Sequence, residues 1–135
     1  MKPPSDIARL VGDLQALGFR VVRDEDGEWP GGPRIALERP RTRGVNAVRL
    51  SVDRGIWEVE VRVGRRWYEP FWALRVLAEL PDQSRAFSHE ERRAFTLEAA
   101  RSIKGTREDR RRLRRRQKEY ERAYTQWATG KGPHP

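Results

Sequence analysis

The sequence predicts an α+β fold: an N-terminal helix, an antiparallel meander of three to four strands covered on one face by helices, and a C-terminal helical pair ending in a long basic helix. Three observations support this class. Apolar residues recur at helical spacing near the N-terminus, whereas residues 34–63 alternate with the period of strands. Turn residues punctuate that region. Charge is also segregated, because residues 101–135 hold 12 Lys/Arg against 4 Asp/Glu and residues 1–100 hold 17 against 16.

The first helix has recognisable start and stop signals. Ser5 or Asp6 can cap its N-terminus, and Gly18 supplies a common C-terminal stop. Between them, apolar residues spaced three or four apart fall on one face, which therefore faces a core: Ile7, Leu10, Val11, Leu14 and Leu17.

Two strands are expected before residue 40. Phe19–Asp24 forms the first and ends at a turn signal, Glu25-Asp26-Gly27. The run Pro30-Gly31-Gly32-Pro33 interrupts any regular structure, and Arg34–Arg39 then forms the second strand.

Asn46–Asp53 and Ile56–Val63 are predicted to form a hairpin joined by Arg54-Gly55. A two-residue loop fixes the register, and in that register one face is apolar while the other is charged. The expected apolar pairs are Val52 with Trp57, Leu50 with Val59 and Val48 with Val61, and the expected polar pairs are Ser51 with Glu58 and Arg49 with Glu60.

A short apolar helix should follow the sheet. Pro70 after Glu69 suits the first helical position, and Phe71–Leu80 continues the helix. After a loop, Ser88 and Glu91 have the spacing of a capping box and predict another helix start.

That helix is expected to run to about Lys104 and to stop at Gly105. Thr106 and Asp109 then repeat the capping signal. The last helix should reach about Ala128, a length of roughly 22 residues or 33 Å.

We expect residues 1–81 to form an α+β core domain, and residues 82–105 to supply a loop and a helix packed on or near it. Residues 106–128 form the basic amphipathic helix, and residues 129–135 a disordered tail. The expected core consists of Ile7, Leu10, Val11, Leu14, Phe19, Val21, Ile35, Leu37, Val48, Leu50, Val52, Trp57, Val59, Val61, Phe71 and Leu74.

The last helix is predicted to have two chemically different sides. At 100° per residue, one arc of about 100° holds the five cations Arg111, Arg114, Arg115, Lys118 and Arg122. An arc of about 60° on the opposite side holds the expected protein-docking residues Leu113, Tyr120, Tyr124 and Trp127. The cationic side suits a polyanion and the apolar side suits protein.

A second basic patch is expected at one end of the sheet. If the strands alternate in direction, the loop over residues 40–45 and the segment after Val63 meet at the same end. This places Arg41, Arg43, Arg65 and Arg66 together, beside Trp67 and Tyr68, in a pattern typical of phosphate and base binding. The alternative is that these loops are charged because they face solvent, and that Trp67 and Tyr68 fill the core.

An enzymatic function and a membrane span find little support. The chain has no Cys and only two His, and we find no motif for a nucleophile, a metal site or a bound cofactor. We therefore expect a protein that is not an enzyme and binds neither metal nor cofactor. No apolar run is long enough for a signal peptide or a membrane span, so a cytoplasmic location is expected.

The leading hypothesis is a nucleic-acid-binding accessory protein that contacts DNA or RNA phosphates electrostatically through the last helix. The alternative is a protein-binding inhibitor or adaptor, such as an immunity-like or mobile-element accessory protein, that binds an acidic protein through Trp, Tyr and Arg anchors. Leu113, Tyr120 and Trp127 also have heptad spacing, so a homodimer through this helix is a further alternative. The last helix could also contact an anionic membrane surface, or it could be a solvated helix that docks on its own body.

Overall fold

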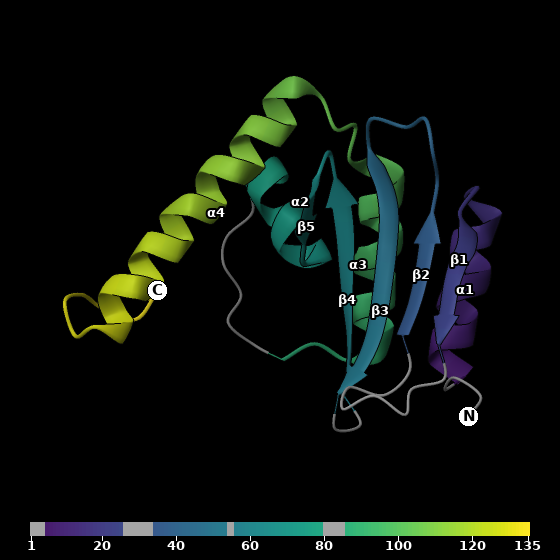
Figure 1. Ribbon diagram of the computed structural model, residues 1–135, viewed down its shortest axis with the longest axis horizontal. Helices are drawn as coiled ribbons and strands as arrows, with labels where there is room; N and C mark the ends of the chain where they lie inside the picture. Colours follow the sequence, from purple (N-terminus) through teal and green to yellow (C-terminus); the bar gives the residue numbers. More distant parts are fainter. Residues whose placement is uncertain (1–4, 26–33, 54–55, 80–85) are drawn as a thin grey trace.

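The computed structural model describes residues 5–25, 34–53, 56–79 and 86–135, and in these ranges the chain forms four helices and one five-stranded sheet (Figure 1). The predicted α+β class is confirmed. The hairpin turn expected at Arg54-Gly55 and the interruption expected at residues 30–33 lie outside the described residues. The elements are α1 (Ser5–Ala16), β1 (Arg20–Glu25), β2 (Arg34–Glu38), β3 (Val45–Asp53), β4 (Ile56–Val63), β5 (Arg66–Tyr68), α2 (Pro70–Ala78), α3 (His89–Ser102) and α4 (Arg107–Ala128).

The sheet is an antiparallel meander in the order β1-β2-β3-β4-β5. The predicted hairpin register is confirmed, since Val52 pairs with Trp57 and Arg49 with Glu60. The Arg49 Nε donates to Glu60 Oε1 at 2.9 Å on the outer face. Alternation of apolar and charged residues thus sets which side of β3 and β4 faces the core.

The sequence predicted three to four strands, and the fifth strand, β5, was missed. It pairs Tyr68 with Val61 and Arg66 with Val63, after a two-residue turn that begins at Gly64. Gly64 has a φ of 64°, which fits the first central position of a tight hairpin turn. Three residues are too few to show strand alternation, so only pairing with β4 defines this element.

Helices cover one face of the sheet, with α3 between α1 and α2 (Figure 1). The predicted core residues lie mainly in the sheet and in the first two helices. In the structure Leu97 of α3 and Ile103, the residue that follows this helix, belong to the same buried cluster. Val21 was wrongly placed in the core: it is 37% exposed, because β1 is an edge strand with an irregular register after this residue.

The predicted starts of α2, α3 and α4 are present. Glu69 caps α2, and its carboxylate accepts hydrogen bonds from the backbone N–H groups at the first turn. Reciprocal capping boxes join Ser88 with Glu91 and Thr106 with Asp109. The helices α2 and α3 end two residues earlier than expected, at Ala78 and Ser102, while α4 ends at Ala128 as predicted.

Two glycines let the loop before β3 cross the loop before α4 in close contact. A Cβ on Gly105, which has a φ of 65°, would lie 1.5 Å from the backbone oxygen of Arg43. A Cβ on Gly44 would lie 2.3 Å from the backbone oxygen of Ile103. We call this close approach the loop crossing. It places the start of α4 against the end of the sheet that carries the predicted second patch.

The first half of α4 packs on α2, and the rest of the helix extends away from the body formed by the sheet and the other helices (Figure 1). The tail expected after Ala128 begins with a turn in which the Gly130 N–H donates to Trp127 O at 3.0 Å. Farther along the tail, the His134 ring contacts the Trp127 ring at a centroid distance of 4.5 Å. No helix in the described ranges is both long and apolar enough to cross a membrane.

Candidate nucleic-acid interface

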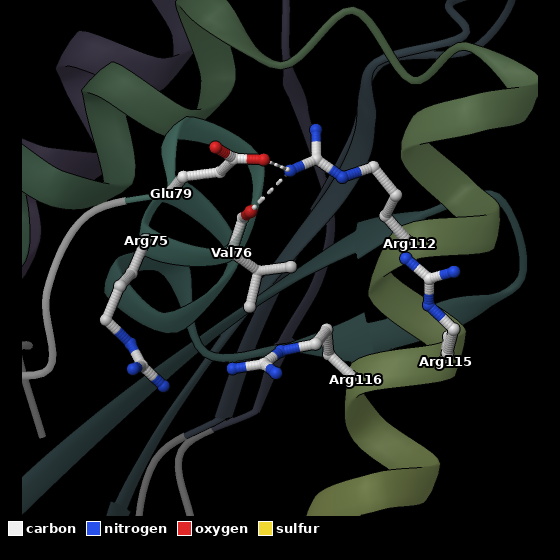
Figure 2. A pocket seen from close by; sticks show the side chains of 6 residues that line it. All are labelled: Arg75, Val76, Glu79, Arg112, Arg115 and Arg116. Carbon is white, nitrogen blue, oxygen red and sulfur yellow. Dashed lines mark hydrogen bonds and ion pairs between the residues drawn. The ribbon is translucent and has the colours of Figure 1, made fainter.

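Two side chains fix α4 to the body. Leu113 is fully buried in the core cluster, so it anchors the helix by apolar contact. Arg112 donates to the backbone oxygens of Val76 at 3.2 Å and Leu77 at 3.4 Å, and it forms an ion pair of 3.0 Å with Glu79 (Figure 2 shows Arg112 with Val76 and Glu79). A cation at the negative end of the α2 dipole is favourable. The angle at which α4 leaves the body is therefore fixed by specific contacts.

The cationic side of α4 and one residue of β5 line a common hollow of about 470 Å³. Arg66 comes from β5, and all five cations predicted on the last helix join it. We call this surface the cationic hollow. The described residues that line it are Arg66, Arg111, Arg114, Arg115, Lys118, Glu119 and Arg122. Six positive charges thus face one carboxylate there.

Most of these charges are available to a ligand. Arg111 pairs with Glu108 one turn earlier on the helix, and both side chains are exposed. In the part of the chain that the structure describes, no carboxylate forms an ion pair with Arg114, Arg115, Lys118 or Arg122. All six cations of the hollow are solvent-exposed, so a polyanion can reach them without displacing protein.

The pKa of Tyr68 is affected by cations of both β5 and α4. Burial raises the pKa of its phenol, while the positive charges of Arg66 and Arg114 act in the opposite direction. The ring of Tyr68 stacks on Trp72 of α2 at 5.7 Å. Fields from two cations on different elements therefore meet at one buried phenol, which agrees with their place in the cationic hollow.

The four arginines of the predicted second patch are exposed. The loop before β3 and the β4–β5 turn meet at one end of the sheet, where Asn46 Nδ2 donates to Gly64 O at 3.0 Å. Arg110 of α4 also lies over this turn, since its Cδ is 3.0 Å from the position of a Cβ on Gly64. Arg41, Arg43 and Arg65 therefore lie on the segments that adjoin the start of α4, while Arg66 lines the cationic hollow.

The two aromatic residues expected beside this patch take other roles. Trp67 lies on the outer face of the sheet, where the guanidinium groups of Arg49 and Arg62 lie 4.2 and 5.4 Å from its ring centroid. Tyr68 is buried in the core. Successive strand residues point to opposite faces. Both rings nevertheless line a third hollow of about 710 Å³, together with Trp72 of α2 and Tyr120 of α4.

Of the four expected protein-docking residues, one is buried in the structure and three are exposed. Leu113 packs in the core of its own body, whereas Tyr120, Tyr124 and Trp127 are 51%, 48% and 39% exposed. The three exposed rings contact one another in sequence, with centroids 6.4 and 5.5 Å apart. The outer half of α4 thus carries an exposed aromatic row.

A second hollow of about 380 Å³, which we call the flank hollow, was not anticipated from the sequence. Arg75 of α2 and Arg116 of α4 extend toward one another across it (Figure 2). Arg115 lines this hollow as well as the cationic one. The spacing of Arg112 and Arg116 by four residues placed both on one flank of α4, but their relation to α2 required the tertiary structure. The described lining is Arg75, Val76, Glu79, Arg112, Arg115 and Arg116.

A scan against protein-family models, a search of curated proteins and a search of solved structures each found no match. Within the described ranges, no group of three or more His, Asp or Glu side chains is placed to hold a metal ion.

Proposed function

We propose that this protein is a non-catalytic accessory protein that binds nucleic acid through electrostatic contacts between α4 and phosphate groups. One observation carries the proposal: six cations from two elements converge on one exposed hollow that contains a single carboxylate among its described lining residues. Arginine binds phosphate oxygens in a bidentate manner, and each phosphate contact releases a condensed counterion. A cytoplasmic location is part of the proposal.

The distribution of charge supports an arm-and-scaffold arrangement. Residues 1–100 are close to neutral, so the positive field originates mainly from α4 and its neighbours. The body holds α4 by Leu113 and Arg112 and leaves its cationic side exposed. Arg41, Arg43 and Arg65 extend the phosphate-binding surface beyond the start of α4. Contacts of this kind position a protein on nucleic acid without reading its sequence.

The proposal is tested by the salt dependence of binding. We would measure fluorescence anisotropy of a labelled duplex of about 20 base pairs between about 50 and 200 mM salt. Six phosphate contacts predict a slope of about −5 in a plot of log affinity against log salt concentration, because each contact contributes about −0.9. The double variant Arg114→Gln/Lys118→Gln should reduce the magnitude of that slope by about 2.

A matched control removes the same charge elsewhere. Arg9 on α1 and Arg20 on β1 are exposed, and β1 lies at the edge of the sheet opposite β5. The variant Arg9→Gln/Arg20→Gln should keep the slope of the unaltered protein. A slope near zero, or an equal loss in both double variants, would show that the cationic hollow does not bind phosphate.

A second candidate function is binding of another protein through the exposed aromatic row. Tyr120, Tyr124 and Trp127 are exposed, and they are of the residue types that dominate interface hot spots. This row would serve an inhibitor or adaptor with an acidic partner, or a homodimer through α4. Sedimentation of the protein alone distinguishes the homodimer. A nuclease-resistant complex lost in Tyr124→Ser, with DNA binding unchanged, would indicate a different protein partner.

A further inference from the structure

The third hollow, of about 710 Å³, is formed by α4, α2 and the free edge of the sheet. β5 is the last strand of the sheet, so residues from both of its faces can reach this hollow. We call it the aromatic hollow, because four aromatic rings of the described residues line it: Trp67 and Tyr68 of β5, Trp72 of α2 and Tyr120 of α4. Three of these rings are accessible, since Trp67 and Trp72 are half-buried and Tyr120 is exposed.

Charge in the aromatic hollow is nearly balanced, in contrast to the cationic hollow. The described residues that line it include two arginines and three carboxylates. Each of these carboxylates has a partner: Glu60 pairs with Arg49, Glu119 pairs with Arg116, and Glu69 accepts hydrogen bonds from the N–H groups that begin α2. The aromatic hollow therefore suits the uncharged, planar part of a ligand, whereas the cationic hollow suits its phosphates.

The aromatic and cationic hollows adjoin one another. Glu119 lines both of them. β5 contributes consecutive residues, Arg66 to the cationic hollow and Trp67 to the aromatic one, and consecutive Cα atoms are only about 3.8 Å apart. α4 likewise contributes Lys118 to the cationic hollow and Gln117 to the aromatic one. A chain of nucleotides with its phosphates in the cationic hollow can therefore place a base in the aromatic hollow.

The aromatic hollow is also lined by a residue with an unsatisfied polar atom. The side-chain oxygen of Gln117 is buried and has no hydrogen-bond partner among the described residues. Buried acceptors in folded proteins are normally satisfied. The edges of bases carry N–H donors, so rotation of the Gln117 amide toward the hollow would give this oxygen a donor from a bound base.

Paired and unpaired bases differ in their access to such a site. In a duplex the faces of the bases are stacked on their neighbours, so an aromatic side chain reaches a base only after that base leaves the stack. Proteins that bind single strands combine a positively charged groove with aromatic side chains on which the free bases stack. β5 and α4 contribute to both of these parts.

We infer that the ligand is single-stranded nucleic acid, with its phosphates in the cationic hollow and a base in the aromatic hollow, stacked on Tyr120. This inference rests on the proposed function and names its ligand class.

The test measures the affinity of the full chain for labelled ligands of about 12 nucleotides, a length within the range of known single-strand sites. The ligands are a thymidine strand, a uridine strand, a sugar–phosphate chain without bases, and duplex DNA. At about 0.2 M salt, where the electrostatic contribution is reduced, the thymidine or the uridine strand should bind more tightly than the duplex. The same strand should bind at least about fivefold more tightly than the chain without bases, since stacking of one base contributes about this factor. The ratio of the thymidine and uridine affinities separates DNA from RNA.

Two tyrosines of α4 provide matched variants. Tyr120 and Tyr124 are similarly exposed, but Tyr120 lines the aromatic hollow and Tyr124 does not. Tyr120→Ala should lower the affinity for the single strand by about fivefold or more, and it should leave the affinities for the duplex and for the chain without bases unchanged. Tyr124→Ala should change none of these affinities. Alanine is well tolerated at exposed helix positions, and circular dichroism checks that both variants remain folded.

The outcomes separate this inference from the proposed function. Equal binding of the chain without bases, equal or tighter binding of the duplex, or an equal loss in Tyr120→Ala and Tyr124→Ala would overturn base stacking in the aromatic hollow. An unchanged single-strand affinity in Tyr120→Ala would overturn it as well. The proposed function would survive in these cases if the salt slope and its reduction in Arg114→Gln/Lys118→Gln persist. Absence of binding to all four ligands would overturn both.

Discussion

Replacing Gly105 with alanine perturbs the loop crossing directly. Gly105 is buried and has a φ of 65°, a left-handed conformation that costs an L-residue about 1–2 kcal/mol. The new Cβ would also lie 1.5 Å from the backbone oxygen of Arg43, where real Cβ contacts are at least 3.0 Å long. The backbone segments at residues 43 and 105 would have to move apart by the difference between these two distances.

The expected loss of stability is the sum of the conformational cost and the cost of the clash. Backbone atoms at the crossing cannot rotate away as the end of a flexible side chain can, so the clash costs about 1–3 kcal/mol, as overpacking of a core does. Together with the left-handed conformation, Gly105→Ala should lower the free energy of unfolding by about 2–5 kcal/mol. Urea unfolding followed by tryptophan fluorescence and circular dichroism measures this as a lower midpoint at an unchanged slope.

Gly130 provides the matched control. Its φ of 73° is similar, but a Cβ there would meet nothing within 4 Å. Gly130→Ala should therefore cost at most the conformational term of about 1–2 kcal/mol. If Gly105→Ala destabilises the protein no more than Gly130→Ala does, the loop crossing is not tight and does not fix the start of α4.

Three further predictions concern stability. Gly12 lies within α1 with open space around it, so Gly12→Ala should raise the unfolding free energy by roughly 0.5–1 kcal/mol; a loss in urea unfolding would contradict this. Leu113→Ala should cost about 2–5 kcal/mol because Leu113 is fully buried, and an unchanged urea midpoint would refute its role as the anchor of α4. Burial raises the pKa of Tyr68 and so disfavours its charged form in the folded state. The contribution of Tyr68 to the free energy of unfolding is therefore fully present below the ordinary pKa of about 10, and it is lost as pH rises through the pKa of the folded state. Urea midpoints measured from pH 9 to 11, a range of about one unit on each side of that pKa, should therefore fall less steeply in Tyr68→Phe than in the unaltered protein, and parallel curves would exclude this effect.

Local patterns determined most of the elements. The β3–β4 register followed from the alternation of apolar and charged residues, because a slip of one residue would turn every side chain to the wrong face. Helix starts followed from capping signals such as Ser88 with Glu91, since backbone N–H groups of the first turn need acceptors within a few residues. The five cations on one side of α4 followed from helical periodicity.

Only the tertiary structure determined which part of the molecule each residue of these patterns contacts. Leu113 and Tyr120 share one stripe, yet Leu113 is buried and Tyr120 is exposed, because the body extends beneath only the first half of α4. Arg112 belongs to the same arginine run as Arg111 but caps α2, a contact across 36 residues that no local pattern encodes.

Arg66 joins the cationic hollow for a similar reason. The place of Arg66 in this hollow depends on the fifth strand, which is too short to be recognised in the sequence. It also depends on the loop crossing, which brings α4 alongside that strand. Sequence alone thus determined local geometry and the sorting of charge along one helix, since both depend on neighbours a few residues apart. The convergence of two elements on one anionic ligand depends on packing between distant segments, and only the folded chain sets that.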